Sequence, residues 1–137
     1  MTSDWSACPY LTEGFPDRVT AVDRRNVRQR DTTIAVHPDC SDPLLAGVFP
    51  IRGDSLWWLE EASQMLHISR DVDLLVSSDD LQQRFGTNVV VFRFKYGRGR
   101  VFHLLGHFYQ KDGNRRGLVA MHRLINNLIL ERVATSN

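Results

Sequence analysis

One histidine in this chain has the right surroundings for acid–base chemistry. His107 follows an apolar segment that ends at Leu105, so we expect it at the carboxyl end of a strand. Ligands of open α/β sheets bind beyond the carboxyl ends of strands, and an imidazole placed there can act as a general acid or base. The alternative is a histidine that is hydrogen-bonded to loop backbone.

An acidic pair, Glu60 and Glu61, is the second candidate for chemistry. Either carboxylate could act as an acid or base or bind sugar hydroxyls, and the preceding Trp57 or Trp58 could stack on a sugar ring. Adjacent tryptophans point in different directions in any secondary structure, so we expect one in the core and the other beside a groove. The alternative is a surface acidic pair on a helix whose tryptophans are both core.

Two groups of arginines could bind anions. Arg98 and Arg100 lie on either side of Gly99 and could contact a phosphate, although the segment lacks the loop length and the following helix of a phosphate cradle. The second group is Arg24, Arg25, Arg28 and Arg30. Solvated side chains are the alternative for both groups. No aromatic residues interleave with the second group, as binding of single-stranded nucleic acid would require.

The other histidines and the two cysteines are not spaced as metal ligands. His103 and His107 share a strand face but are separated by roughly 13 Å of extended chain, so one ion cannot bind both. We expect His103 to be a hydrogen-bonded core residue. Cys8 and Cys40 are expected to be free thiols, with a disulfide as the alternative. The sequence therefore predicts no metal and no cofactor.

The composition of the chain indicates its class of protein, but it says little about its function. The chain has 137 residues, enough for one domain. Its formal net charge of +1 gives no reason to expect a nucleic acid partner. The N-terminus lacks the basic start and following apolar run of a signal peptide. No apolar stretch is long enough to span a membrane. We therefore expect a cytoplasmic protein.

The strongest structural pattern lies in residues 88–108. Val89 to Lys95 alternate, with Val90, Phe92 and Phe94 on one apolar face, which predicts a strand. The glycines of residues 96–99 allow a reversal of the chain. Residues 100–106 return as a nearly all-apolar strand, which we expect to be central or near-central in its sheet.

Weaker patterns predict the other elements. Residues 117–134 have a period of about 3.6 and predict an amphipathic helix that packs on the sheet, with Leu118, Met121, Leu124, Ile125, Leu128 and Ile129 on the apolar face and Arg123, Asn126, Asn127 and Glu131 elsewhere. Strands are expected at 32–36 and 72–77, a helical turn from Pro43 to Gly47, a possible helix at 54–62 and a polar turn at 79–86. Residues 1–31 read as an irregular lead-in, with at most a short strand or helix at 18–22, and 32–137 as a single α/β domain.

Several of these segments together resemble a known family. They are DPLLAGV (42–48), WLEE (58–61), the strand 72–76, YGRGRVF (96–102) and LGH (105–107). The combination is similar to the C-terminal half of the trehalose-utilisation (ThuA-like) proteins of the class I glutamine-amidotransferase-like superfamily. The resemblance covers residues 32–133 and implies a flavodoxin-like sheet flanked by helices, truncated on its N-terminal side.

The chain departs from that family's pattern in three ways. Asp42 stands where the family has histidine before the proline, the acidic pair is Glu60-Glu61 rather than Asp-Glu, and residues 1–31 stand in place of the first strands. A sheet without those strands would leave a long open edge, and open edges recruit other chains. We therefore expect a homo-oligomer or a piece of a once longer protein.

The resemblance also bears on activity. Class I amidotransferases use a cysteine on a tight strand-to-helix elbow flanked by small residues, and neither Cys8 nor Cys40 has that setting. We therefore do not expect glutamine hydrolysis. The leading hypothesis is a non-catalytic binding or assembly module with a possible sugar-like ligand. The alternatives are a carbohydrate-metabolism enzyme that uses His107 with Glu60 or Glu61, and an anion-binding adaptor built on the second group of arginines.

Overall fold

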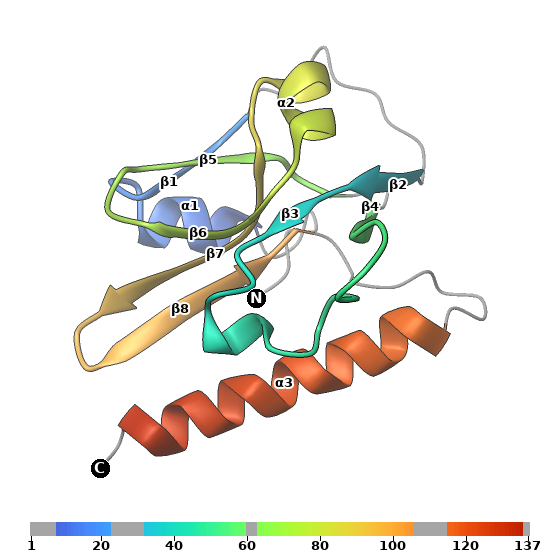
Figure 1. Ribbon diagram of the computed structural model, residues 1–137. Coiled ribbons are helices and arrows are strands. Elements are labelled where there is room, and N and C mark those ends of the chain that lie inside the picture. Colours follow the sequence, from blue (N-terminus) through green and yellow to red (C-terminus); the bar gives the residue numbers. More distant parts are fainter. Residues whose placement is uncertain (1–7, 23–31, 60–62, 106–114, 136–137) are drawn as a thin grey trace.

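The computed structural model describes residues 8–22, 32–59, 63–105 and 115–135. In chain order, the elements in these ranges are α1 (Cys8–Gly14), β1 (Val19–Ala21), β2 (Thr32–Ala35), β3 (His37–Pro38), the 3₁₀ helix η1 (Pro43–Leu45), β4 (Leu56–Leu59), β5 (Leu66–Ile68), β6 (Asp73–Ser77), α2 (Asp79–Phe85), β7 (Val89–Tyr96), β8 (Gly99–Leu104) and α3 (Arg115–Thr135) (Figure 1). None of the described helices is long and apolar enough to cross a membrane.

The strands form one sheet and two short ribbons. The sheet has the order β3-β6-β7-β8, and the ribbons are β1-β5 and β2-β4. The mixed α/β class predicted from the sequence is confirmed. Every strand pairing in the described ranges is antiparallel, however, so these strands do not form the parallel arrangement of a flavodoxin-like sheet.

The predicted hairpin is present as β7 and β8, joined by Gly97 and Arg98. Gly97 takes a φ of 57°, and none of the described non-glycine residues has a positive φ. Positive φ at the first central residue alone is the pattern of a type II′ turn, whose twist suits a two-residue hairpin loop. Register pairs Phe92 with His103 and Arg93 with Phe102, so the sheet face of each side chain is defined.

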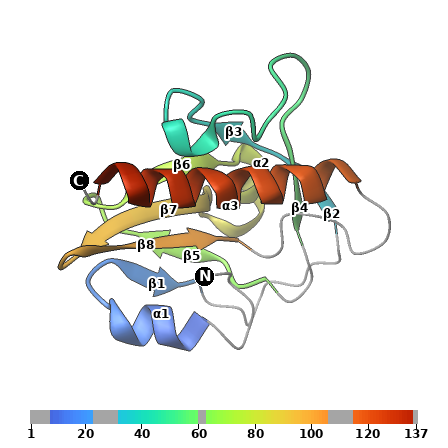
Figure 2. The same ribbon diagram turned by 90° about the horizontal axis from the view of Figure 1, so that it is seen from below.

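The sheet lies between two layers. Figures 1 and 2 show α3 and η1 on one face of the β7–β8 hairpin and α1 with the β1-β5 ribbon on the other. Each layer has its own apolar cluster. The cluster on the α1 side has seven buried residues: Leu11, Val19, Leu66, Val72, Val89, Phe92 and Phe94.

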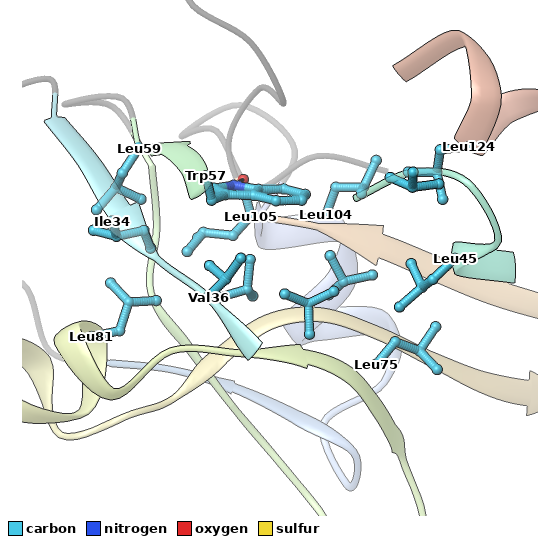
Figure 3. Packing of buried hydrophobic residues seen from close by; sticks show 14 of the residues in the cluster. Ile34, Val36, Leu45, Trp57, Leu59, Leu75, Leu81, Leu104, Leu105 and Leu124 are labelled. Carbon is cyan, nitrogen blue, oxygen red and sulfur yellow. Dashed lines mark hydrogen bonds between the residues drawn. The ribbon is translucent and has the colours of Figure 1, made fainter. Parts of the chain in front are cut away.

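The larger cluster lies among β2, β4, the sheet and α3 (Figure 3). Trp57 is 1% exposed and stacks on Phe49 at a ring distance of 6.5 Å. Its indole Nε1 donates a hydrogen bond of 2.8 Å to the Leu105 carbonyl. A buried indole needs such a partner, and this bond ties β4 to the end of β8.

Two expectations about the hairpin strands are wrong. β7 does not have one apolar and one polar face, because Val89, Val90, Val91 and Phe92 are all buried between the two layers. β8 is not central, because in the described part of the chain it forms an edge of the four-stranded sheet. Its side chains are buried only toward its carboxyl end, at His103, Leu104 and Leu105, whereas Val101 and Phe102 are partly buried against the two clusters.

The segments 54–62 and 79–86 also differ from expectation. Where a helix was considered possible, Leu56–Leu59 pairs with β2 as strand β4. Where a polar turn was expected, Asp79–Phe85 forms α2, because Ser78 Oγ accepts a hydrogen bond from the Leu81 N–H and Gly86 closes the helix with a φ of 71°. These end signals are local, and α2 was predictable from them.

Residues 8–22 are not the irregular lead-in that was expected. They form α1 and β1, and Leu11 and Val19 are 0% and 1% exposed in the second cluster. The short strand considered at 18–22 is present, and it pairs with β5. The described part of the N-terminal segment therefore contributes directly to the core.

α3 is amphipathic as predicted, and Met121, Leu124 and Leu128 of the predicted apolar face pack on the core, but other residues of that face do not. Leu124 is buried, whereas Ile125 and Ile129 are 46% and 58% exposed. Asn127, which was assigned to the polar side, is buried, because its Nδ2 donates to the carbonyls of Leu44 and Ala46 at 2.8 and 2.9 Å. Carbonyl groups at the end of η1 need hydrogen-bond donors, and a polar residue of α3 provides them.

His103 is buried in the core, and its ring is not hydrogen-bonded to any described residue, contrary to the prediction. Its side chain is 1% exposed and its ring lies 4.9 Å from the ring of Phe92. Neither ring nitrogen has a hydrogen-bond partner in the described part of the chain. Burial lowers the pKa of His103 from its usual 6.5 to about 3, because the low-polarity surroundings disfavour the imidazolium.

Candidate ligand-binding groove

A groove of about 380 Å³ lies between the β7–β8 hairpin and the C-terminal part of α3. We call it the hairpin groove. Its lining residues are Arg93, Lys95, Gly97, Arg98, Gly99, Arg100, Phe102, Leu128 and Glu131. The hairpin and the helix therefore form a site with four cationic side chains, one carboxylate and an apolar wall.

Strand alternation explains why cations gather on this face. Arg93 and Lys95 alternate with Phe92 and Phe94, whose rings belong to the α1-side cluster. Lys95 pairs in register with Arg100, and a residue directly opposite another across two strands shares its face of the sheet. The aromatic core on one side of the hairpin thus places positive charge on the other side.

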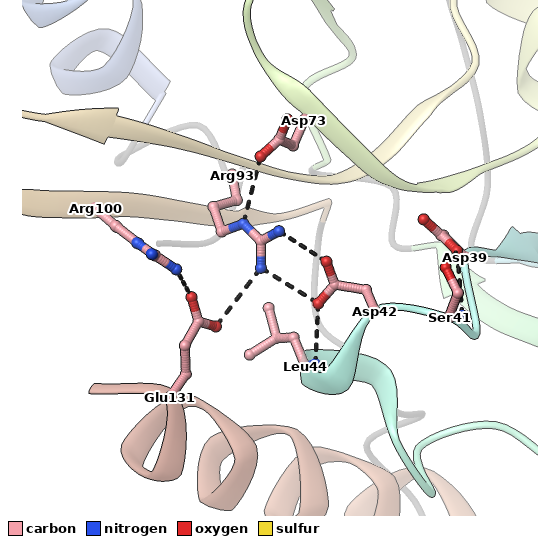
Figure 4. A network of polar contacts seen from close by, with 8 residues as sticks. All are labelled: Asp39, Ser41, Asp42, Leu44, Asp73, Arg93, Arg100 and Glu131. Carbon is pink, nitrogen blue, oxygen red and sulfur yellow. Dashed lines mark hydrogen bonds and ion pairs between the residues drawn. The ribbon is translucent and has the colours of Figure 1, made fainter. Parts of the chain in front are cut away.

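Arg93 is the most heavily paired of these cations (Figure 4). Its guanidinium donates to both carboxylate oxygens of Asp42, with Nη2–Oδ2 at 2.7 Å and Nη1–Oδ1 at 3.3 Å. Its Nε lies 3.6 Å from Asp73 Oδ2. Burial opposes the charge of Arg93, but the hydrogen bonds and charges of these two carboxylates outweigh it and raise the Arg93 pKa.

Asp42 is also the N-cap residue of η1. Its Oδ1 accepts a hydrogen bond of 3.0 Å from the Leu44 N–H, which caps the helical turn. Burial alone would raise the pKa of Asp42, but the hydrogen bonds from Arg93 and from the Leu44 backbone lower it below its usual 3.8. The aspartate that departs from the ThuA-like pattern is therefore an anchor between η1 and the sheet.

Glu131 brings a carboxylate from α3 to the wall of the groove. One of its oxygens, Oε2, lies 3.6 Å from Arg93 Nη1, and the other, Oε1, contacts Arg100 Nη1 directly. Figure 4 shows the side chain reaching from the helix to both guanidinium groups. This carboxylate therefore partly neutralises two of the four cations.

Lys95 and Arg98 are the other two cations. Both are exposed at the turn end of the groove, and neither forms an ion pair with a described carboxylate. Phe102 and Leu128 provide apolar surface beside them. Ammonium and guanidinium groups are the usual partners of carboxylate and phosphate oxygens. The arrangement can therefore bind an anion that carries a less polar part.

Of the candidate site residues predicted from the sequence that the structure describes, only one pair lies in this groove. Arg98 and Arg100 line it. Trp57 is fully buried and cannot stack on a ligand, while Trp58 is half-buried on β4 and is not among the lining residues. His107, Glu60 and Glu61 lie outside the described residues, as do Arg24, Arg25, Arg28 and Arg30. The convergence of His107 with a carboxylate, which the enzyme hypothesis needs, stays a prediction.

Cys40 lacks the setting of an activated nucleophile, and the described acidic residues do not gather into a metal-binding cluster. Cys40 is an exposed free thiol in the turn before η1, not on a strand-to-helix elbow. Across the described ranges, no three His, Cys, Asp or Glu side chains gather in a way that could hold a metal ion. The groove's chemistry, as far as these residues define it, is binding of charge.

Sequence reasoning missed Arg93, Lys95 and Glu131 as members of a site. A signal was present for Arg93, because a cation between Phe92 and Phe94 in a strand must find a counter-charge if the strand is buried. Its partner Asp42 lies 51 residues away in the chain, and no local pattern pairs them. Only the docking of α3 brings Glu131 to the same place.

Comparisons with known proteins support the fold only. No protein-family model and no curated protein matches the chain. Among solved structures, the chain is similar to a Thermoplasma acidophilum protein that is provisionally named as one component of GMP synthase, with a TM-score of 0.52 and 14% identity. The match covers 93% of this chain and 56% of that one, so this chain spans little more than half of its neighbour. The broad amidotransferase-like fold is supported, and the ThuA-like family is not singled out.

Proposed function

We propose that this chain is a non-catalytic binding module with an amidotransferase-like α/β fold, and that its hairpin groove binds a small ligand with an oxyanion group. The observation that carries the proposal is the pair Lys95 and Arg98, two exposed cations without an ion-pair partner among the described carboxylates, beside an apolar wall. A ThuA-like origin is the narrower form of the same proposal.

The groove favours a ligand with two unlike ends. A phosphate or carboxylate would lie at the hairpin turn, where Lys95 and Arg98 can donate to its oxygens. The rest of the ligand would lie against Phe102 and Leu128, and burial of that surface adds affinity. A sugar phosphate is one ligand of this kind, and it retains the sugar-like character expected from the sequence.

The absence of catalysis rests on the described residues. Cys40 does not have the setting of an activated nucleophile, and the groove holds no histidine among its lining residues. Arg93 and Arg100 are engaged by carboxylates and act as fixed charges. These features favour binding over turnover.

Assembly is the second part of the proposal. β8 is an edge of the four-stranded sheet in the described part of the chain, and its unpaired backbone groups offer a template for another strand. A homo-oligomer formed through this edge would place two hairpin grooves near one interface.

The test of the binding proposal is a thermal-shift and calorimetric series with four probes: inorganic phosphate, phenyl phosphate, glucose 6-phosphate and glucose. A ligand at a hundred times its Kd stabilises the native state by about 2.7 kcal/mol. We expect the three phosphates to raise the midpoint and glucose not to do so. Phenyl phosphate should bind more tightly than inorganic phosphate, because its ring can pack on Phe102 and Leu128.

The decisive variant is K95Q/R98Q, and its control is R70Q/R84Q. The control removes the same charge at exposed positions outside the groove. We expect at least roughly a tenfold loss of phosphate affinity in the first variant, since two charge-assisted hydrogen bonds are lost, and less than a twofold loss in the second. Equal losses in both variants would mean that the anion responds to net charge and not to the groove.

A further inference from the structure

The carboxylate of Glu131 already holds the position that an anionic ligand would take beside two of the groove's cations. It contacts Arg100 directly and lies 3.6 Å from Arg93, and its side chain is 22% exposed at the groove wall. An incoming anion would have to lie beside this carboxylate or displace it from Arg100. Either outcome lowers the affinity for the ligand, by repulsion or by loss of an ion pair.

We propose that Glu131 is a built-in competitor that sets the affinity of the hairpin groove and disfavours ligands of high negative charge. The inference rests on the proposed function, because it concerns regulation of the same site. With Glu131 in place, Arg93 and Arg100 are partly neutralised and Lys95 and Arg98 carry the recognition. In this form the groove opposes a second negative charge on the ligand more strongly than it would without the Glu131 carboxylate.

Arg93 and the helix that carries Glu131 have other stabilising contacts, and Arg100 is partly exposed to solvent. Arg93 already has a bidentate partner in Asp42, with one bond of 2.7 Å, so the longer contact to Glu131 is secondary. Arg100 is 37% exposed and can be hydrated when its partner leaves. α3 is held on η1 by other means, through the hydrogen bonds of Asn127 and Arg123 to backbone carbonyls.

Two features separate this role from a purely structural ion pair. A structural pair would change stability on mutation but leave anion affinity unaltered. A competitor would change affinity in proportion to ligand charge, because the repulsion between carboxylate and ligand grows with that charge. The charge of the ligand is therefore the variable that distinguishes them.

The test compares the full chain with Glu131→Gln by titration calorimetry, using phenyl phosphate as the probe of higher charge and benzenesulfonate as the singly charged probe of similar shape. Glu13→Gln is the matched control, since it makes the same change in net charge on α1, across the sheet from the groove (Figure 2). We expect E131Q to bind phenyl phosphate roughly tenfold more tightly than the wild type. The gain for benzenesulfonate should be smaller, and E13Q should gain less than twofold.

The outcomes for the inference and for the proposed function are distinguishable. If the wild type binds phenyl phosphate, K95Q/R98Q loses it and E131Q does not bind it more tightly, the groove is a binding site but Glu131 is not a competitor. If E131Q binds and the wild type shows no measurable binding, competition is supported directly. If neither protein binds either probe, both proposals are overturned. An equal gain for the two probes would also overturn the inference.

Discussion

The buried histidine gives the sharpest prediction about this protein, a loss of stability in mild acid. In the folded state His103 stays neutral down to a pH of about 3, because burial depresses its pKa from 6.5. In the unfolded chain the same imidazole takes up a proton below about pH 6.5. The unfolded state therefore binds more protons over this range, and the free energy of unfolding falls as the pH falls.

The size of the effect follows from one proton per chain. Once the imidazole of the unfolded chain is fully charged, each further pH unit down to the folded pKa removes about 1.4 kcal/mol of stability. Because that imidazole is half charged at pH 6.5, a change from pH 6.5 to 4.5 removes roughly 2.3 kcal/mol. Domains have only about 5 to 15 kcal/mol in total. Well above pH 6.5 the histidine adds no dependence on pH, since it is neutral in both states.

The perturbation is His103→Leu, followed by urea unfolding at pH 7.5, 6.5, 5.5 and 4.5. We expect the slope of stability against pH below 6.5 to fall by about 1.4 kcal/mol per unit relative to the wild type. At pH 7.5 the variant should gain roughly 1 to 3 kcal/mol, because two buried ring nitrogens without described partners are removed. His67→Leu, at an exposed position on β5, is the control for loss of a histidine.

The same wild-type slope in His103→Leu would refute this reasoning, because it would mean that His103 is protonated equally in the folded and unfolded states. Titration of the ring by NMR is an independent check. A His103 signal that moves near pH 6.5 in the folded protein would show that the ring reaches solvent or has a partner, and the predicted acid sensitivity would then be wrong.

Two further predictions concern the anchor of η1 and the assembly of the chain. Asp42→Asn should cost roughly 1 to 3 kcal/mol at pH 7, because it removes the charge that pairs with the half-buried Arg93, whereas the exposed Asp54→Asn should cost less than about 0.5 kcal/mol. Because the pKa of Asp42 is lowered in the folded state, its contribution to stability is present above pH 3.8 and is lost as the pH falls below that value. The unfolding free energies of the wild type and Asp42→Asn, measured in urea, should therefore converge in acid. A constant difference between them would show that the charge is not responsible. For assembly, light scattering coupled to size exclusion should give a mass above the monomer's 15.7 kDa for the wild type. The substitution Arg100→Pro, at a residue whose N–H faces the free edge of β8 because the alternate residues of this strand bond to β7, should return it to a monomer; a monomeric wild type at high concentration would remove the proposal.

Local patterns determined the elements whose stabilising contacts lie close together in the chain. The β7–β8 hairpin follows from β-branched and aromatic alternation with Gly97 at its turn, and the helical turn of η1 follows from the cap at Asp42 and the proline after it. The amphipathic character of α3 is equally local, as is the capping of α2, which sequence reasoning overlooked. In each case the stabilising contacts lie within one continuous segment of the chain.

Contacts between distant residues decided the rest, and only the tertiary structure shows them. Residues 56–59 became a strand because β2 offers them a partner, and α3 buries Asn127 instead of Ile125 because η1 presents open carbonyls. The hairpin groove depends on Arg93 meeting Asp42 and Glu131, three residues from three separate elements. Such pairings depend on how the layers pack against one another. The free energy of a buried charge depends on all of its surroundings, and those surroundings exist only in the packed chain.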